Sequence, residues 1–181
     1  MAVNRGKQFE DQVKKSFEQV PHTSVFRLID PQNGYAGVRN ICDFIVYHRP
    51  FQYFIECKSV HGNTLSIHSN DPSKRYGMIT NNQWEGLLKM SKIDGVVAGV
   101  IVWYVDQDLT MFYPIQLLSA LRDKWGYKSV SYLLHKRVEI HAGKKTLVRD
   151  NKFYIIPGTK RRVLFDYDMA EFFKEVEISN E

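Results

Sequence analysis

The chain has 181 residues, of which 44% are hydrophobic, 13% aromatic and 25% charged, a composition typical of a globular domain with its own hydrophobic core. We therefore predict a single domain over residues 1–181. No run approaches the roughly 18–20 apolar residues of a membrane span. The opening residues lack the apolar stretch of a signal peptide. These observations argue against a membrane partner and favour a cytoplasmic protein.

The pattern of apolar residues predicts an α/β protein without internal repeats. Phe9, Val13 and Phe17 recur at helical spacing, so we expect a helix over residues 5–20. A strand over 24–29 and a loop over 30–37 precede a β-hairpin over 40–59. After the hairpin we expect a polar loop over 61–77 and a helix over 81–92 that Thr80 caps. A buried central strand over 96–105 follows, with its hairpin partner over 109–114. The chain then continues with a helix over 115–125, a basic region and a short helix over 168–175.

The predicted hairpin consists of two apolar, aromatic and β-branched runs that flank Arg49-Pro50. We expect His48 to lie opposite Tyr53, which leaves a loop of about four residues, a common hairpin length. Two further pairs follow from this register, Asp43 with Lys58 and Ile45 with Glu56.

Side chains alternate between the two faces of a strand, so this register sorts the hairpin into two kinds of surface. One face carries Asp43, Ile45, Tyr47, Phe54, Glu56 and Lys58. The other face is almost wholly apolar and carries Cys42, Phe44, Val46, Ile55 and Cys57. A loop of odd length would put Asp43 and Glu56 on opposite faces. The register that separates polar from apolar residues thus also gathers the carboxylates.

Charged residues inside apolar strands need a chemical explanation, because a buried carboxylate is costly unless it is paired or holds a metal. Asp43, Glu56 and Lys58 on one face suit a nuclease that uses Mg²⁺, with Mn²⁺ as a substitute, since Mg²⁺ takes one or two carboxylates beside waters and substrate phosphate. Lys58 would position or help deprotonate the attacking water and neutralise the charge that develops on the phosphorane. The alternative is a structural salt bridge between Lys58 and either carboxylate.

The two cysteines, Cys42 and Cys57, are too few for a disulfide framework. No CxxC motif or histidine spacing supports zinc. We predict that both are small buried hydrophobic residues in a reducing compartment.

The net charge is +5, and the basic residues fall in clusters. These clusters are Lys14-Lys15, Lys74-Arg75, His135-Lys136-Arg137, Lys144-Lys145 and Lys160-Arg161-Arg162. Basic patches can bind a phosphate backbone by releasing counterions, which predicts DNA as a partner. For any one cluster, a solvated surface is the alternative explanation.

Taken together, the motifs resemble those of the RecU Holliday-junction resolvases in the PD-(D/E)xK, restriction-endonuclease-like nuclease superfamily. The resemblance runs almost from end to end. The matching residues are Asn4-Arg5-Gly6 with Phe9-Glu10, Asp43, Glu56-Cys57-Lys58, Gln83 within Met78–Trp84, Lys128–Tyr132, Ile156-Pro157 and Leu164–Tyr167.

The resemblance implies an α/β fold with a restriction-endonuclease-like mixed β-sheet flanked by α-helices, and an endodeoxyribonuclease that needs Mg²⁺. It implies a homodimer that resolves four-way DNA junctions by paired nicking, and it admits a recombinase as a further partner. The implied metal ligands are Asp43, Glu56 and the backbone carbonyl of Cys57. The implied catalytic residues are Asp43, Glu56, Lys58, Gln83, which would orient water, metal or phosphate, and Glu10, which would reach the metal through water.

Several residues have alternative explanations or depart from the family pattern. Glu10 could instead be an N-terminal-turn glutamate that the helix dipole favours, and Gln83 could be an exposed helix residue. Arg5 and Lys7 are predicted phosphate contacts, as are Lys74 and Arg75. The family's long stalk, which enters the junction, is much shorter here, over residues 25–41. The segment 61–77, with His68, Lys74, Arg75 and Tyr76, is our candidate replacement, or else a surface loop.

Three functions therefore remain open from the sequence. The first is a junction-resolving endonuclease, which the motifs favour. The second is a nuclease with the same active site that acts on duplex, flaps or ends in repair or restriction. The third is a non-catalytic DNA-binding accessory protein whose hairpin charges are structural.

Overall fold

The structure is a computed structural model, and it describes residues 4–28, 40–67, 77–133 and 153–180. Its centre is a six-stranded sheet with the order β1-β2-β3-β5-β6-β8. The strands are β1 (Thr23–Arg27), β2 (Phe44–His48), β3 (Phe51–Val60), β5 (Val96–Tyr104), β6 (Leu109–Pro114) and β8 (Tyr154–Ile155). Strands β3 and β5 are parallel and the other neighbours are antiparallel, so the sheet is mixed.

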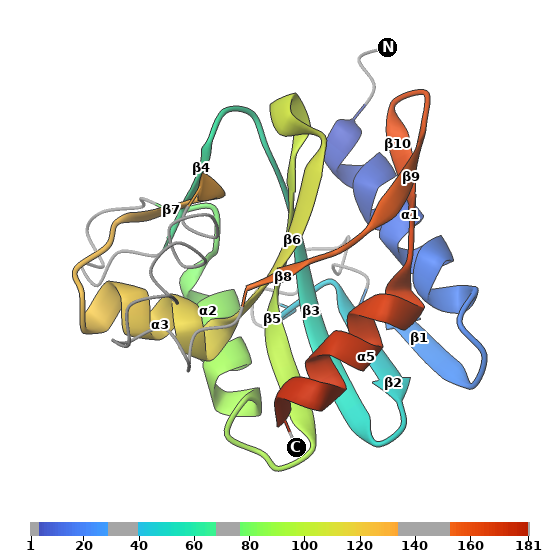
Figure 1. The fold of residues 1–181 in the computed structure, drawn as a ribbon. Coiled ribbons are helices and arrows are strands. Elements are labelled where there is room, and N and C mark those ends of the chain that lie inside the picture. The colour runs from blue at the N-terminus through green and yellow to red at the C-terminus, as the bar shows by residue number, and fades with distance from the viewer. Residues whose placement is uncertain (1–3, 29–39, 68–76, 134–152, 181) are drawn as a thin grey trace, which may run out of the picture.

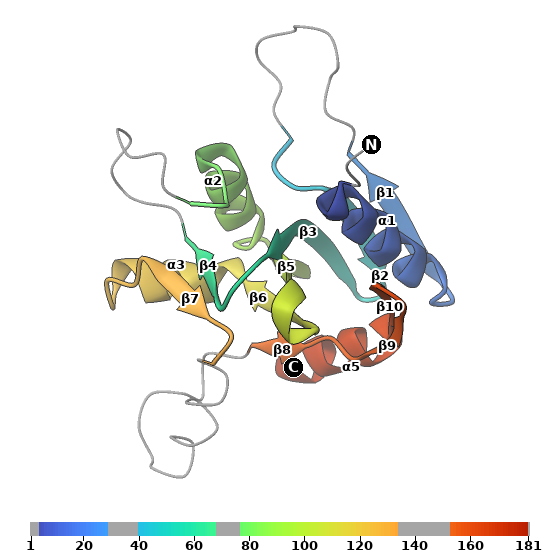
Figure 2. The same cartoon turned by 90° about the horizontal axis from the view of Figure 1, so that it is seen from above.

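Two pairs of helices cover opposite faces of this sheet (Figures 1 and 2). Helices α1 (Arg5–Glu18) and α5 (Met169–Asn180) contribute Phe9, Phe17 and Phe172 to the hydrophobic core on one face. Helices α2 (Asn81–Met90) and α3 (Ile115–Asp123) contribute Trp84 and Leu118 to the core on the other face. The predicted fold class, a mixed β-sheet flanked by α-helices, is confirmed.

The central position of β5 follows from its composition. Residues 97–104 are all buried, because helices cover both faces of this strand. The predicted hairpin partner is also confirmed, since Trp103 of β5 pairs with Thr110 of β6 in an antiparallel register. A short 3-10 helix, η1 (Val105–Gln107), makes the connection.

Two small two-stranded sheets were not predicted. Strand β4 (Thr64–Ser66) pairs with β7 (Ser129–Ser131), so the predicted polar loop over 61–77 contains a strand. Strand β9 (Gly158–Arg161) pairs with β10 (Leu164–Tyr167) beside α1. The closing helix α5 is also longer than predicted and ends at Asn180. Short strands of mixed composition give little periodic signal, which explains why they escaped prediction.

The hairpin of β2 and β3 forms, but its register differs from the prediction. Val46 lies opposite Tyr53 and His48 lies opposite Phe51, so the loop consists of Arg49 and Pro50 alone. The predicted pairing is wrong by two residues. Because side chains alternate with a period of two, an even shift leaves each strand residue on its predicted face.

Both cysteines are buried and free, as predicted. Their placement is only partly as expected. Cys57 packs with Phe44 and Ile55 in the core under α1 and α5, whereas Cys42 packs with Phe54 in the core under α2 and α3. Cys42 lies before β2 begins, where strand alternation no longer determines its direction. Across the described ranges, no helix has the length and apolar character that a membrane crossing requires.

Candidate active site

Asp43 is held at the point where strand β2 begins, beside the middle of β3. Its backbone nitrogen donates to the Ile55 carbonyl at 3.0 Å. Its carboxylate accepts a hydrogen bond from the backbone nitrogen of Cys57 at 2.7 Å. Together these bonds place Asp43 alongside Glu56, and not opposite Lys58 as the predicted register required. The correction brings the two carboxylates closer in register than the prediction did.

Glu56 is the most unusual residue of the site, because it is a carboxylate with only 1% of its surface exposed. Its Oε1 accepts hydrogen bonds from Lys58 Nζ and, at 2.6 Å, from Gln83 Nε2. Its Oε2 is buried and has no hydrogen-bond partner among the residues that the structure describes. A buried, unpartnered carboxylate oxygen carries a desolvation cost that a cation would offset.

The electrostatic environment of Glu56 reflects that cost. Burial raises the pKa of Glu56 from 4.5 to about 7, because loss of water disfavours the charged carboxylate. Lys58 opposes this rise, whereas the neighbouring carboxylates of Asp43 and Glu10 add to it. The carboxylates of Glu10, Asp43 and Glu56 therefore influence one another, and Lys58 only partly balances their charge.

Gln83 joins helix α2 to this site. It is the third residue of the helix, and its Oε1 accepts a hydrogen bond from the backbone nitrogen of Thr80 at 3.0 Å. The Thr80 hydroxyl accepts from the Gln83 backbone nitrogen at 3.3 Å, which completes a capping box. The predicted cap at Thr80 is thus confirmed. The Gln83 amide binds the cap through its oxygen and Glu56 through its nitrogen.

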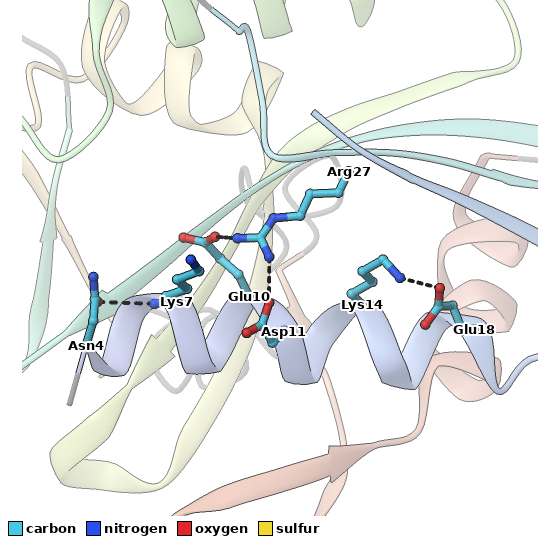
Figure 3. A network of polar contacts seen from close by, with 7 residues as sticks. All are labelled: Asn4, Lys7, Glu10, Asp11, Lys14, Glu18 and Arg27. Atoms are coloured by element: carbon cyan, nitrogen blue, oxygen red, sulfur yellow. Dashed lines mark hydrogen bonds and ion pairs between the residues drawn. The ribbon is translucent and has the colours of Figure 1, made fainter. Parts of the chain in front are cut away.

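Glu10 projects from α1 toward Arg27, which holds its carboxylate (Figure 3). Arg27 of β1 donates from one guanidinium nitrogen to Glu10 and from the other to Asp11, the latter at 2.5 Å. Burial raises the pKa of Glu10, and the nearby Asp43 raises it further, while Arg27 lowers it. Glu10 lies in the second turn of α1, whose first turn has no acidic residue, so the predicted dipole explanation does not apply.

The predicted phosphate contacts divide into two groups. Arg5 and Lys7 are exposed in the first turn of α1, which begins after the Asn4 cap. Lys74 and Arg75 lie outside the described residues, as do His68 and Tyr76 of the predicted stalk replacement.

Three residues that support the site were missed from the sequence. Arg27 holds Glu10, and its position in a strand gave no signal of a partner in α1. Asn82 donates to the Asn40 carbonyl at 2.9 Å, on the approach to Asp43. Gly86 lets α2 pack closely against Ile41, since an added Cβ would lie 2.5 Å from Ile41 Cβ. An isolated glycine in a predicted helix was the one available signal.

The donor set fits a hard divalent cation. The unpartnered Oε2 of Glu56 and the adjacent Asp43 carboxylate are the oxygen ligands that Mg²⁺ accepts, and it commonly uses only one or two carboxylates beside its waters. Over the part of the chain that the structure describes, no group of three or more His, Cys, Asp or Glu side chains gathers closely enough to hold an ion. The fit is therefore to a metal with few protein ligands and not to a closed, zinc-like site.

Comparisons with known proteins give a partial likeness to solved structures. No protein-family model matches the chain, and no curated protein is similar to it. Among solved structures, the chain is similar to Hjc of Archaeoglobus fulgidus, described as a Holliday junction resolvase from an archaeal hyperthermophile. The sequences are 18% identical, the TM-score is 0.43, and the likeness covers 62% of this chain and 78% of that chain. The RecU resemblance therefore stays a prediction.

Proposed function

We propose that the chain is a Mg²⁺-dependent endonuclease that hydrolyses DNA phosphodiester bonds, and that its preferred substrate is a four-way junction. One observation carries the proposal. Glu56 keeps a carboxylate in an almost fully buried position. One of its oxygens is bound by Lys58 and Gln83, and the other has no partner within the described ranges of the chain. A buried carboxylate oxygen without a partner costs about 1–3 kcal/mol in desolvation, and a bound cation would offset that cost.

Asp43 and Glu56 would hold the metal, with the Cys57 carbonyl as a third ligand. When bound, Mg²⁺ would polarise the scissile phosphate and lower the pKa of a water molecule. The hydrogen bond from the Cys57 nitrogen restrains the Asp43 carboxylate, so this ligand would be oriented before the ion arrives. The raised pKa of Glu56, about 7, means that bound cation and bound proton would compete for this carboxylate.

The remaining residues would act on water and phosphate. Lys58 would donate to the attacking water or to the phosphate oxygens, where negative charge develops in the transition state. Gln83 would orient Glu56 through the hydrogen bond of 2.6 Å and could also contact the water. Glu10 would reach the site through a water molecule, from a carboxylate that Arg27 holds in place. The exposed Arg5 and Lys7 would contact neighbouring phosphates.

The junction preference and the homodimer are the finer parts of the proposal. Resolution of a four-way junction needs two coordinated incisions, and two chains related by a two-fold axis would supply one active site each. The sequence motifs around Glu10, Asp43, Glu56 and Gln83 support this substrate by their resemblance to junction resolvases.

The test is cleavage of a labelled four-way junction with and without Mg²⁺, beside linear duplex made from the same arms. We expect paired nicks in the junction that need the metal. Asp43→Asn and Lys58→Ala should abolish cleavage and retain DNA binding. Cleavage of both substrates at equal rates would exclude junction selectivity and favour the duplex nuclease.

The accessory-protein alternative draws support from the ion pair of Lys58 with Glu56, which is the structural contact that it requires. Under that alternative, the wild-type protein shows no metal-dependent nicking, and Asp43→Asn changes only its stability. That pair of results would overturn the nuclease proposal.

A further inference from the structure

The hairpin of β9 and β10 presents three consecutive cations at its tip, Lys160, Arg161 and Arg162, and all three are exposed. Lys160 pairs with Asp108, and Arg161 pairs with Asp166 at 2.8 Å. No ion pair of Arg162 occurs among the described residues. The tip therefore has at least one cation that is available to an external anion.

The backbone of Arg162 is in an unusual conformation for an arginine. Arg161 pairs with Leu164, so Arg162 and Val163 form a two-residue turn, and Arg162 has a φ of 52°. Glycine, asparagine and aspartate are favoured at such positions because they tolerate the left-handed region. A non-glycine residue held in this region often marks a functional position, and here the residue kept at the turn is a cation.

The hairpin extends along α1 toward the start of that helix. The backbone nitrogen of Tyr167 donates to Ser16 Oγ at 3.1 Å, and Asp166 accepts from Gln12 at 2.9 Å. Earlier residues of β10 therefore lie beside earlier residues of α1. The five residue steps from Tyr167 to Arg162, through β10 and the turn, span at most about 16 Å at 3.3 Å each. The eleven helix residues from Ser16 to Arg5 span about the same length at 1.5 Å each. Along the helix axis, the tip thus reaches the level of the first turn of α1.

That first turn lies at the end of the sheet that carries the candidate active site. A Cβ added at Gly6 would lie 3.8 Å from Ser59 Oγ, next to Lys58 in β3. The same end includes Asp108, the partner of Lys160, in the connection between β5 and β6. Figure 1 shows the start of α1, the tip of the hairpin and the β5–β6 connection at this one end of the molecule.

We propose that the tip of the β9–β10 hairpin, residues Lys160 to Arg162, binds the phosphate backbone of DNA. The contact extends the DNA surface from the active site, across Arg5 and Lys7 in the first turn of α1, to Arg162. It positions DNA without reading sequence, because cations on phosphates supply affinity and register and not base recognition. This inference rests on the proposed function in one respect, which is that the protein binds DNA.

The test measures how binding of a labelled four-way junction, in EDTA, depends on salt for Arg162→Asn. Asparagine suits the left-handed turn, so this variant should fold with an unchanged or raised melting temperature. We expect weaker binding and a slope of log Kobs against log salt that is smaller in magnitude by about 0.9, the value for one lost phosphate contact.

Lys92→Asn is the matched control, because it removes the same charge and introduces the same residue. Lys92 is exposed and follows the last turn of α2, whose first turn contacts Glu56, so it lies at the far end of that helix from the site. We expect the wild-type slope for this variant.

The outcomes separate this inference from the proposed function. If the wild-type protein binds DNA and Arg162→Asn keeps the wild-type slope, the hairpin contact is wrong while the nuclease proposal stands. If Asp43→Asn abolishes cleavage and the slope still falls in Arg162→Asn, both are supported. If the wild-type protein does not bind DNA, both are overturned.

Discussion

The side chain of Gln83 ties the first turn of helix α2 to the buried carboxylate of Glu56. Its Nε2 donates to Glu56 Oε1 at 2.6 Å, while its Oε1 accepts from the Thr80 backbone at 3.0 Å. An amide suits both tasks, since it offers a donor on one side and an acceptor on the other. The orientation of Glu56 therefore depends on the cap of a helix that is distant from it in sequence.

Replacement of Gln83 tests this connection. Gln83→Ala removes the donor to Glu56, and we expect Mg²⁺-dependent cleavage to fall about 10- to 100-fold, as it does when partners of metal ligands are lost. Thr80→Ala removes the hydroxyl of the cap and leaves the Glu56 contact intact. We expect it to lower the free energy of unfolding by about 1 kcal/mol, with a smaller effect on cleavage. Equal cleavage losses in both variants would contradict a specific role for the amide.

The raised pKa of Glu56 predicts a pH-dependent loss of stability in the absence of metal. Folded Glu56 has a pKa of about 7 against an ordinary value of 4.5, so the folded chain binds this proton more tightly than the unfolded chain does. The free energy of unfolding should therefore fall as pH rises from 4.5 to 7, by up to about 3 kcal/mol from this group.

Glu56→Gln should flatten that dependence, because glutamine does not titrate. Urea unfolding in EDTA at pH 5 and pH 7.5 measures the difference for both proteins. Addition of Mg²⁺ at pH 7.5 should stabilise the wild-type protein and have little effect on Glu56→Gln, since an ion that binds only the folded state shifts the equilibrium toward it. An identical pH dependence in the two proteins would contradict the assignment to Glu56.

The contacts of Arg27 with Glu10 and Asp11 predict a measurable coupling. Arg27→Gln leaves a partly buried Glu10 beside Asp43 without its cation, and we expect a loss of about 1–2 kcal/mol after allowance for solvent screening. The double variant Arg27→Gln/Glu10→Gln should recover part of this loss. A double-mutant cycle from urea unfolding gives the coupling energy.

The control for this cycle lies on the same helix. Lys14 pairs with Glu18 four residues further along α1, as Figure 3 shows, and about one-third or more of each side chain is open to solvent. Lys14→Gln should cost less than about 0.5 kcal/mol, since exposed pairs at this spacing contribute little. A loss as large as that of Arg27→Gln would mean that the position near Asp43 has no special effect.

Gly86 predicts an effect that runs against helix propensity. Glycine to alanine inside a helix ordinarily stabilises by up to about 1 kcal/mol. Here the new Cβ would lie 2.5 Å from Ile41 Cβ, so Gly86→Ala must displace Ile41, two residues before Asp43. We expect a net loss of about 1–3 kcal/mol, together with lower Mg²⁺-dependent cleavage. Glu85→Ala, an exposed neighbour, should change neither quantity, and a stabilised Gly86→Ala would refute the clash.

Features with a local cause were predictable from the sequence. The cap at Thr80 depends on the residues that follow it, and the buried strand β5 depends on an unbroken apolar run. The shared face of Glu56 and Lys58 was predictable as well, because residues two apart in a strand lie on the same face. The residue types alone also limited the chemistry of that face to carboxylate and ammonium groups.

Features that join distant segments were decided by the tertiary structure. Alternation in a strand determines the face of a residue and not its register. The observed loop consists of Arg49 and Pro50 alone, so Asp43 lies beside Glu56 and not opposite Lys58 as predicted. The contacts of Gln83 with Glu56 and of Arg27 with Glu10 join residues that no local pattern relates. Burial of Glu56 likewise arises only when α2 closes over the sheet, and the resulting loss of water is what raises its pKa.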